Sequence, residues 1–178
     1  MKLNFRNIIS AGLVSPLLLA ALNVHAHIVL EQKSATAGSY YKATFMVGHG
    51  CDGSPTTGID IEMPEPMAVV KPMPKPGWQL TTQTAPLATP MSLHGKPITE
   101  TVNRVIWKGG PLPDGHYDEF VLLLQLPLRS GLLHFKVAQS CESGRSDWVE
   151  MPIRGQTGRM QLPAPALELQ PAVPAHHH

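Results

Sequence analysis

Residues 120–128 read Phe-Val-Leu-Leu-Leu-Gln-Leu-Pro-Leu, a run that is apolar at odd and even positions alike. Such a run predicts a strand covered on both faces. Tyr40–Val47 instead alternates, with Tyr41, Ala43, Phe45 and Val47 on one face. Further runs that read as strands are Gly58–Met63, Thr99–Trp107, Leu132–Ala138 and Ser146–Met151.

Turn-forming clusters separate these runs, among them Asp52-Gly53-Ser54-Pro55, Pro74-Lys75-Pro76-Gly77, Pro113-Asp114-Gly115 and Arg129-Ser130-Gly131. No stretch after residue 26 has convincing helical periodicity. Short strands with regular turns predict one all-β domain, an antiparallel β-sandwich of the immunoglobulin-like or cupredoxin-like kind.

The first 26 residues have the composition of a signal peptide. Lys2 and Arg6 precede an apolar segment, Ile8–Leu22, and Val24-His25-Ala26 supplies a small-residue cleavage site. The segment has about 15 residues, fewer than the roughly 20 that span a bilayer. We predict cleavage after Ala26, export to the periplasm and a mature chain that is soluble and does not span the membrane. An uncleaved anchor and an earlier cut, after Ala20 or Ala21, are the alternatives.

The mature chain is predicted to be one compact domain, residues 27–162, followed by a flexible tail, residues 163–178. The tail is rich in Pro and Ala and ends in His176–His178, which are either native or the remnant of a purification tag. Loss of Lys2 and Arg6 with the leader reduces the 14 basic side chains to 12, one fewer than the 13 acidic ones. This balance, without a basic cluster, argues against a nucleic-acid partner.

Two cysteines, Cys51 and Cys141, lie in the exported part of the chain. An even number of cysteines in an oxidising compartment predicts a disulfide. The bridge would close a loop of about 90 residues and stabilise the fold by on the order of 4 kcal/mol. Two thiolates that bind Cu(I) or Zn are the alternative.

Cleavage after Ala26 would make His27 the first residue. Its α-amine and its ring Nδ1 could then chelate one metal ion, and these nitrogens with a carboxylate suit tetragonal Cu(II). Asp118 and Glu119 begin the apolar strand on opposite faces, so one of the two carboxylates lies at the rim of the core. Glu119 is the best candidate for the third ligand, and a solvated carboxylate at the start of the strand is the alternative. Trp148 is either a core residue of the sandwich or a ring that lies over the bound ion.

Several segments together resemble the YcnI family of exported copper-binding β-sandwich proteins. They are His27-Ile28-Val29, Ala37-Gly38-Ser39-Tyr40, Val47–Thr57 with its Gly48-His49-Gly50-Cys51 core, Lys75-Pro76-Gly77-Trp78, Tyr117-Asp118-Glu119-Phe120 and Asp147-Trp148-Val149. The resemblance covers residues 27 to about 153. It implies a single-histidine brace for Cu(II), with the amine and ring of His27, the carboxylate of Glu119, and Trp148 packed over the copper.

The sequence therefore predicts a non-enzymatic copper chaperone or copper-homeostasis protein, whose partners are the copper ion and other periplasmic copper-handling proteins. His49 and His116 are candidates for auxiliary ligands. Met63, Met67 and Met73 are either gap-filling side chains or soft ligands for Cu(I). Two other functions remain open: a copper monooxygenase that uses His27 and a second histidine, and a structural or interaction sandwich without metal.

Overall fold

The computed structural model describes residues 27–153 and 158–172. The predicted signal peptide, residues 1–26, and His176–His178 lie outside the described residues. Within the described part the chain forms twelve strands and no helix, so it contains no helix long and apolar enough to cross a membrane. The prediction of an all-β antiparallel sandwich is confirmed.

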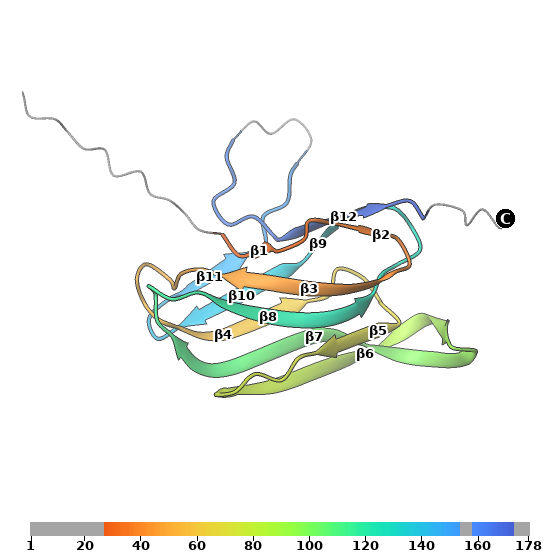
Figure 1. The fold of residues 1–178 in the computed structure, drawn as a ribbon, viewed down its shortest axis with the longest axis horizontal. Coiled ribbons are helices and arrows are strands. Elements are labelled where there is room, and N and C mark those ends of the chain that lie inside the picture. The colour runs from red at the N-terminus through yellow and green to blue at the C-terminus, as the bar shows by residue number, and fades with distance from the viewer. Residues whose placement is uncertain (1–26, 154–157, 173–178) are drawn as a thin grey trace, which may run out of the picture.

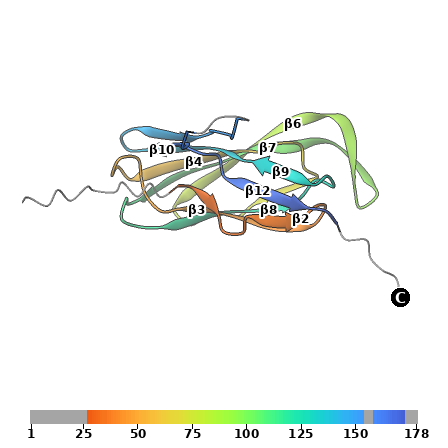
Figure 2. The same ribbon diagram turned by 90° about the horizontal axis from the view of Figure 1, so that it is seen from above.

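The strands form two main sheets and one smaller sheet (Figures 1 and 2). The first main sheet has the order β1 (Val29–Leu30), β3 (Tyr40–Val47), β8 (Asp118–Gln125), β5 (Val69–Pro72). The second has the order β11 (Arg145–Trp148), β10 (Lys136–Cys141), β4 (Thr56–Glu62), β7 (Lys96–Leu112), β6 (Trp78–Leu93). The smaller sheet has the order β2 (Ser34–Thr36), β12 (Ala166–Gln170), β9 (Gly131–His134).

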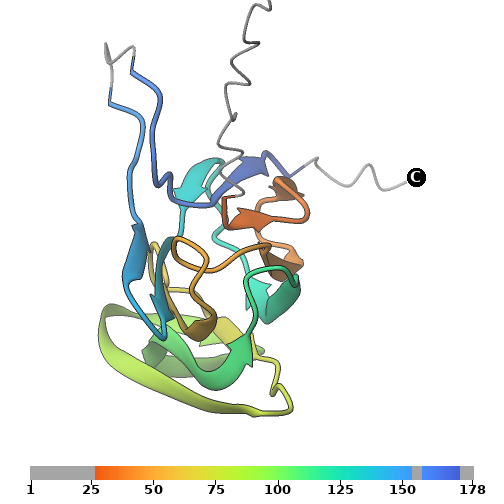
Figure 3. The same ribbon diagram turned by 90° about the vertical axis from the view of Figure 1, so that its left-hand side faces the viewer.

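The core lies between the two main sheets and follows from the alternation in β3 and β8. Phe45 pairs with Phe120 in the antiparallel register, and both side chains are buried. Figure 3 shows the sheets end on, with the long β6–β7 hairpin in green on one side of the core. Trp107 of β7 and Trp148 of β11 close the core from the second sheet, each at most 1% exposed.

The prediction that residues 120–128 are covered on both faces is wrong. Leu123 is 42% exposed and Leu128 is 89% exposed. Leu123 lies on the outward face, and its cross-strand neighbours are Lys42 of β3 and Lys71 of β5. The aliphatic stems of lysines can flank an outward leucine while their charged ends stay in water, so this strand tolerates an apolar outer face.

The predicted single strand Leu132–Ala138 is two strands in different sheets. β9 pairs with β12, whereas β10 pairs with β4 and β11. The change of sheet occurs at Phe135, which is fully buried and donates its N–H to the carbonyl of Pro165 at 2.8 Å. Leu133, Phe135 and Val137 are all buried, so the inward alternation runs straight through the change of sheet.

For residues 163–172, the prediction of a flexible tail is also wrong. Ala166–Gln170 forms β12, which is antiparallel to β9 and parallel to β2. Leu167 and Leu169 are at most 2% exposed, whereas the side chains between and after them are polar. This two-residue alternation is a strand pattern, and the fold therefore extends past residue 162.

Candidate functional site

His27 lies at the start of the described chain, directly before β1, and is half-buried. Its imidazole meets the indole of Trp148 edge-on, with ring centroids 5.7 Å apart and an interplanar angle of 70°. The residue also lines a pocket of about 280 Å³ together with residues 28–30 and 163–166. The structure therefore brings together two of the predicted site residues, His27 and Trp148.

Trp148 belongs to the core and is held there by a side-chain hydrogen bond. The residue ends β11, is 1% exposed, and donates its Nε1–H to Oε1 of Gln139 at 3.0 Å. Of the two interpretations of Trp148, its burial supports a core residue of the sandwich. Because its ring also contacts His27, the same side chain forms a buried wall beside the start of the domain.

His49 meets Trp148 as well. The two ring centroids are 5.9 Å apart with an interplanar angle of 72°. Nδ1 of His49 lies 2.5 Å from the carbonyl oxygen of Gly50, and Nε2 is buried without a hydrogen-bond partner. One indole is thus flanked by two imidazoles, from His27 and His49.

The loop that carries His49 requires glycine at position 50. A Cβ at Gly50 would lie 1.7 Å from the carbonyl oxygen of Ser54. Cys51 and Ser54 exchange two backbone hydrogen bonds around Asp52 and Gly53, both of which have positive φ. Such a tight two-residue turn favours the Asp-Gly pair, and it brings the chain back close to Gly50.

The disulfide between Cys51 and Cys141 is confirmed, with an S–S distance of 2.06 Å. It joins the residue next to Gly50 to the end of β10. Since β11 follows β10 directly, the bridge connects the His49 loop to the hairpin that carries Trp148.

Gln139 is the residue that connects these groups, and it is not among the site residues predicted from the sequence. Its side chain is fully buried and donates Nε2–H to the carbonyl of His49 at 2.7 Å and to the hydroxyl of Thr56 at 2.8 Å. Its oxygen accepts from Trp148. One feature of the sequence could have identified Gln139. It follows Val137 by two residues in a strand and therefore shares its inward face, where a polar side chain needs hydrogen-bond partners.

The two candidate carboxylates have different surroundings. Asp118 forms an ion pair with Lys75 at 2.5 Å, on the side of β8 that faces the core. Glu119 points to the opposite face, where it pairs with Met46, which in turn pairs with Val29 of β1. Its carboxylate accepts a hydrogen bond from the hydroxyl of Tyr117, which raises the pKa of that tyrosine, as do nearby carboxylates.

No described contact joins Glu119 to His27, and within residues 27–153 and 158–172 no three His, Cys, Asp or Glu side chains gather as a metal-binding group. In a histidine brace, one of the metal ligands is the α-amine of the main chain. A brace therefore needs fewer side-chain ligands than a cluster of three His, Cys, Asp or Glu residues. The unpartnered Nε2 of His49 and the ring of His27 beside one indole fit a site that takes nitrogen ligands. His116 is exposed in its turn and is not among these contacts.

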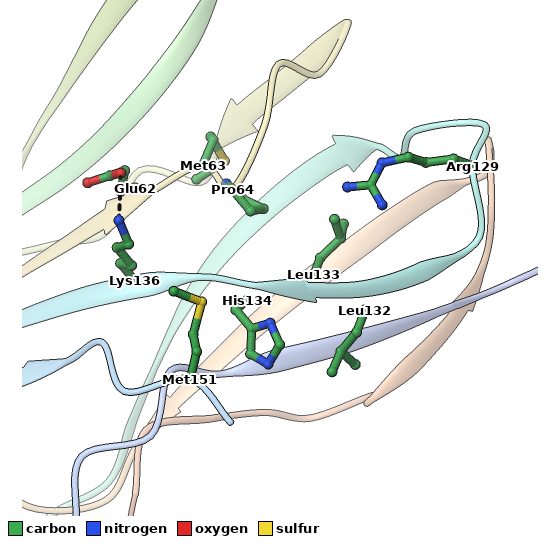
Figure 4. A pocket seen from close by; sticks show the side chains of 9 residues that line it. All are labelled: Glu62, Met63, Pro64, Arg129, Leu132, Leu133, His134, Lys136 and Met151. Carbon is green, nitrogen blue, oxygen red and sulfur yellow. Dashed lines mark ion pairs between the residues drawn. The ribbon is translucent and has the colours of Figure 1, made fainter. Parts of the chain in front are cut away.

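A separate pocket, of about 280 Å³, lies between β4 and the β9–β10 junction (Figure 4). Its lining includes Met63, His134 and Met151, and an ion pair between Glu62 and Lys136 at 3.6 Å lies at one side. His27, Glu119 and the two candidate auxiliary histidines, His49 and His116, do not line it. Met63 and Met67 are buried in the core, which favours their interpretation as gap-filling side chains, whereas Met73 is 51% exposed.

Comparison with known proteins identifies the domain. The sequence profile of a family described as a domain of unknown function (DUF1775) matches residues 27–169. No curated protein matches the chain. An uncharacterized protein from Nocardia farcinica, whose crystal structure is described as revealing an immunoglobulin-like fold, superposes with a TM-score of 0.62 at 21% identity, over 80% of this chain and 97% of the other. This likeness shows the fold.

Proposed function

Because the chain belongs to the DUF1775 family, the family of the YcnI proteins that it resembles, we propose that it is a periplasmic copper carrier. In this proposal the mature protein binds one Cu(II) ion through the α-amine and Nδ1 of His27. Glu119 supplies a carboxylate, and Trp148 shields the ion from water. The role is transport or homeostasis of copper and not catalysis.

One observation carries the proposal: the ring of His27 lies against buried Trp148. The family match, which also begins at residue 27, agrees with it. A domain that starts at this residue supports cleavage after Ala26, which would free the amine. The indole face can stabilise a nearby cation by about 1 kcal/mol, and a buried ring excludes water from one side of the ion.

Glu119 supports the proposal by its position. Val29, Met46 and Glu119 lie in register across β1, β3 and β8, so the glutamate side chain shares the outer face of the strand that follows His27. Asp118 is paired with Lys75, which favours Glu119 over Asp118 as the carboxylate ligand. On metal binding, the carboxylate of Glu119 would exchange its hydrogen bond with Tyr117 for the ion.

Competition titration of the mature protein with Cu(II) tests this proposal. We expect one ion per chain, with loss of tight binding for His27→Ala and for a variant that keeps one extra alanine before His27. The added alanine turns the amine into an amide but leaves the imidazole in place. His116→Ala is the matched control, because this exposed histidine lies outside the contacts of the site.

The affinity should also weaken as the pH falls, because protons compete with copper for the amine and imidazole nitrogens. Equal Cu(II) affinity for the wild type and the alanine-extended variant would contradict the brace. Equal affinity at neutral and acidic pH would contradict nitrogen ligation.

A copper monooxygenase is the second candidate function, because His49 places a second imidazole beside Trp148. Such an enzyme consumes oxygen when copper and a reductant are present. Oxygen consumption that is lost in His49→Ala would favour this candidate over the carrier.

A further inference from the structure

We propose that His49 binds the same copper ion through Nε2 and gives the site a second imidazole ligand. The inference rests on the proposed function, because the ion concerned is the one held by His27. It is carried by an unpartnered buried nitrogen, by the placement of two histidines around one indole, and by the way the His49 loop is fixed.

The hydrogen bond of Nδ1 fixes which nitrogen can bind metal. The carbonyl oxygen of Gly50 can only accept, so Nδ1 of His49 carries the proton in their 2.5 Å contact. In the neutral ring Nε2 then holds a free lone pair. Histidine ligands of metals usually donate their other ring N–H to a carbonyl or carboxylate in this way.

Burial makes this free lone pair costly unless a ligand takes it. Nε2 of His49 is shielded from solvent and has no hydrogen-bond partner, one of only three such side-chain atoms among the described residues. An unsatisfied buried acceptor destabilises the fold, because it has lost its hydrogen bonds to water and gained none in return. A metal ion that accepts this lone pair would remove the penalty.

The strand register brings His49 and His27 into the same neighbourhood. Val29 pairs with Met46, and Leu30 with Phe45. His27 precedes Val29 by two residues and His49 follows the end of β3 by two residues, so both histidines lie at the same end of this strand pair. Both rings then meet the indole of Trp148 edge-on, at 5.7 Å and 5.9 Å between centroids.

The loop is held in place from three directions. Gln139 donates to the carbonyl of His49 at 2.7 Å, Asp114 accepts from the N–H of Gly50 at 2.8 Å, and the disulfide anchors Cys51. These contacts use backbone atoms and the neighbouring cysteine. They therefore persist when the imidazole is replaced, and the ring is positioned before metal binds.

Pulsed electron paramagnetic resonance of the mature protein loaded with one equivalent of Cu(II) tests the inference. Electron spin-echo envelope modulation counts coordinated imidazoles through their remote nitrogens. We expect two imidazoles in the wild type and one in His49→Ala. Cu(II) affinity should fall by about 10- to 100-fold or more, since even the loss of outer-shell partners has this effect at metal sites. His49→Gln repeats the test with a larger side chain, and His116→Ala is the control.

The outcomes separate the inference from the proposed function. A single imidazole in the wild type, with binding that depends on His27 and is unchanged in both His49 variants, overturns the inference and leaves the carrier intact. Binding that survives His27→Ala overturns the proposed function itself. Two imidazoles that fall to one in the folded His49 variants, as judged by an unchanged thermal transition, establish the inference.

Discussion

At the scale of single residues, Tyr41 shows how the fold controls an ionisable group at the start of β3. The side chain lies in β3, is 4% exposed, and donates its hydroxyl to the carbonyl of Gln32 at 2.5 Å. Burial, aided by the nearby charge of Glu31, raises the pKa of Tyr41 from 10.0 to about 12. The segment that follows His27 and β1 is thereby tied to the core through a protonated phenol.

This pKa shift predicts a loss of stability at alkaline pH. Between pH 10 and about pH 12 the unfolded chain releases the phenolic proton while the folded chain keeps it. The folded state then binds more protons, so the free energy of unfolding falls as the pH rises through this range. Urea unfolding at several pH values should show a smaller fall for Tyr41→Phe than for the wild type. Tyr40→Phe, at a 51% exposed neighbour, is the control, and equal slopes for both variants would refute the assignment.

At the scale of elements, the β10–β11 hairpin organises the site through Gln139. The buried side-chain amide of Gln139 forms hydrogen bonds with the indole of Trp148, the carbonyl of His49 and the hydroxyl of Thr56. The disulfide ties the end of the same strand to the loop. The hairpin therefore fixes Trp148, whose ring meets both His27 and His49, with contacts that lie inside the protein.

Replacement of Gln139 by leucine should destabilise the domain strongly. The indole N–H and the carbonyl of His49 would remain buried without their partner, at a cost on the order of 3 kcal/mol. Chemical denaturation measures this loss. Gln83→Leu, on exposed β6, should change stability by less than about 0.5 kcal/mol, and a similar small change for Gln139→Leu would show that the network is not structural.

Strand β12 yields a second prediction at this scale, because the composition of this segment predicts a flexible tail and the structure shows a strand. Leu167 is fully buried and pairs with Leu133. Leu167→Ala should lower the free energy of unfolding by about 2–5 kcal/mol. Leu132→Ala, on the neighbouring strand and 50% exposed, should cost less than about 1 kcal/mol. Wild-type stability for Leu167→Ala would mean that the strand does not belong to the fold.

At the scale of the whole molecule, the sequence predicts the sandwich where strands bury one face. Tyr40–Val47 and Gly58–Met63 correspond closely to β3 and β4. β6 could not be predicted, because it is an edge strand with little burial on either face and contains Pro86 and Pro90. Prolines are tolerated at such edges but weaken the strand signal. The register shift at Pro86 shows the disturbance.

The candidate site was predictable to a smaller extent. The sequence points to His27 and Trp148, and the structure brings these two together. The inward turn of His49 depends on Gln139, which is 90 residues away. No local pattern encodes such a contact, because it arises only when the first sheet packs against the second.

The proposed copper site requires that the exported protein begin at His27. Native mass spectrometry of the exported protein, with and without one equivalent of Cu(II), reports both the first residue and the copper stoichiometry. The account predicts a chain that begins at His27 and gains one copper ion, and that loses this ion when an alanine precedes His27. A mature chain that begins at another residue, or one that begins at His27 and binds no copper, would contradict it.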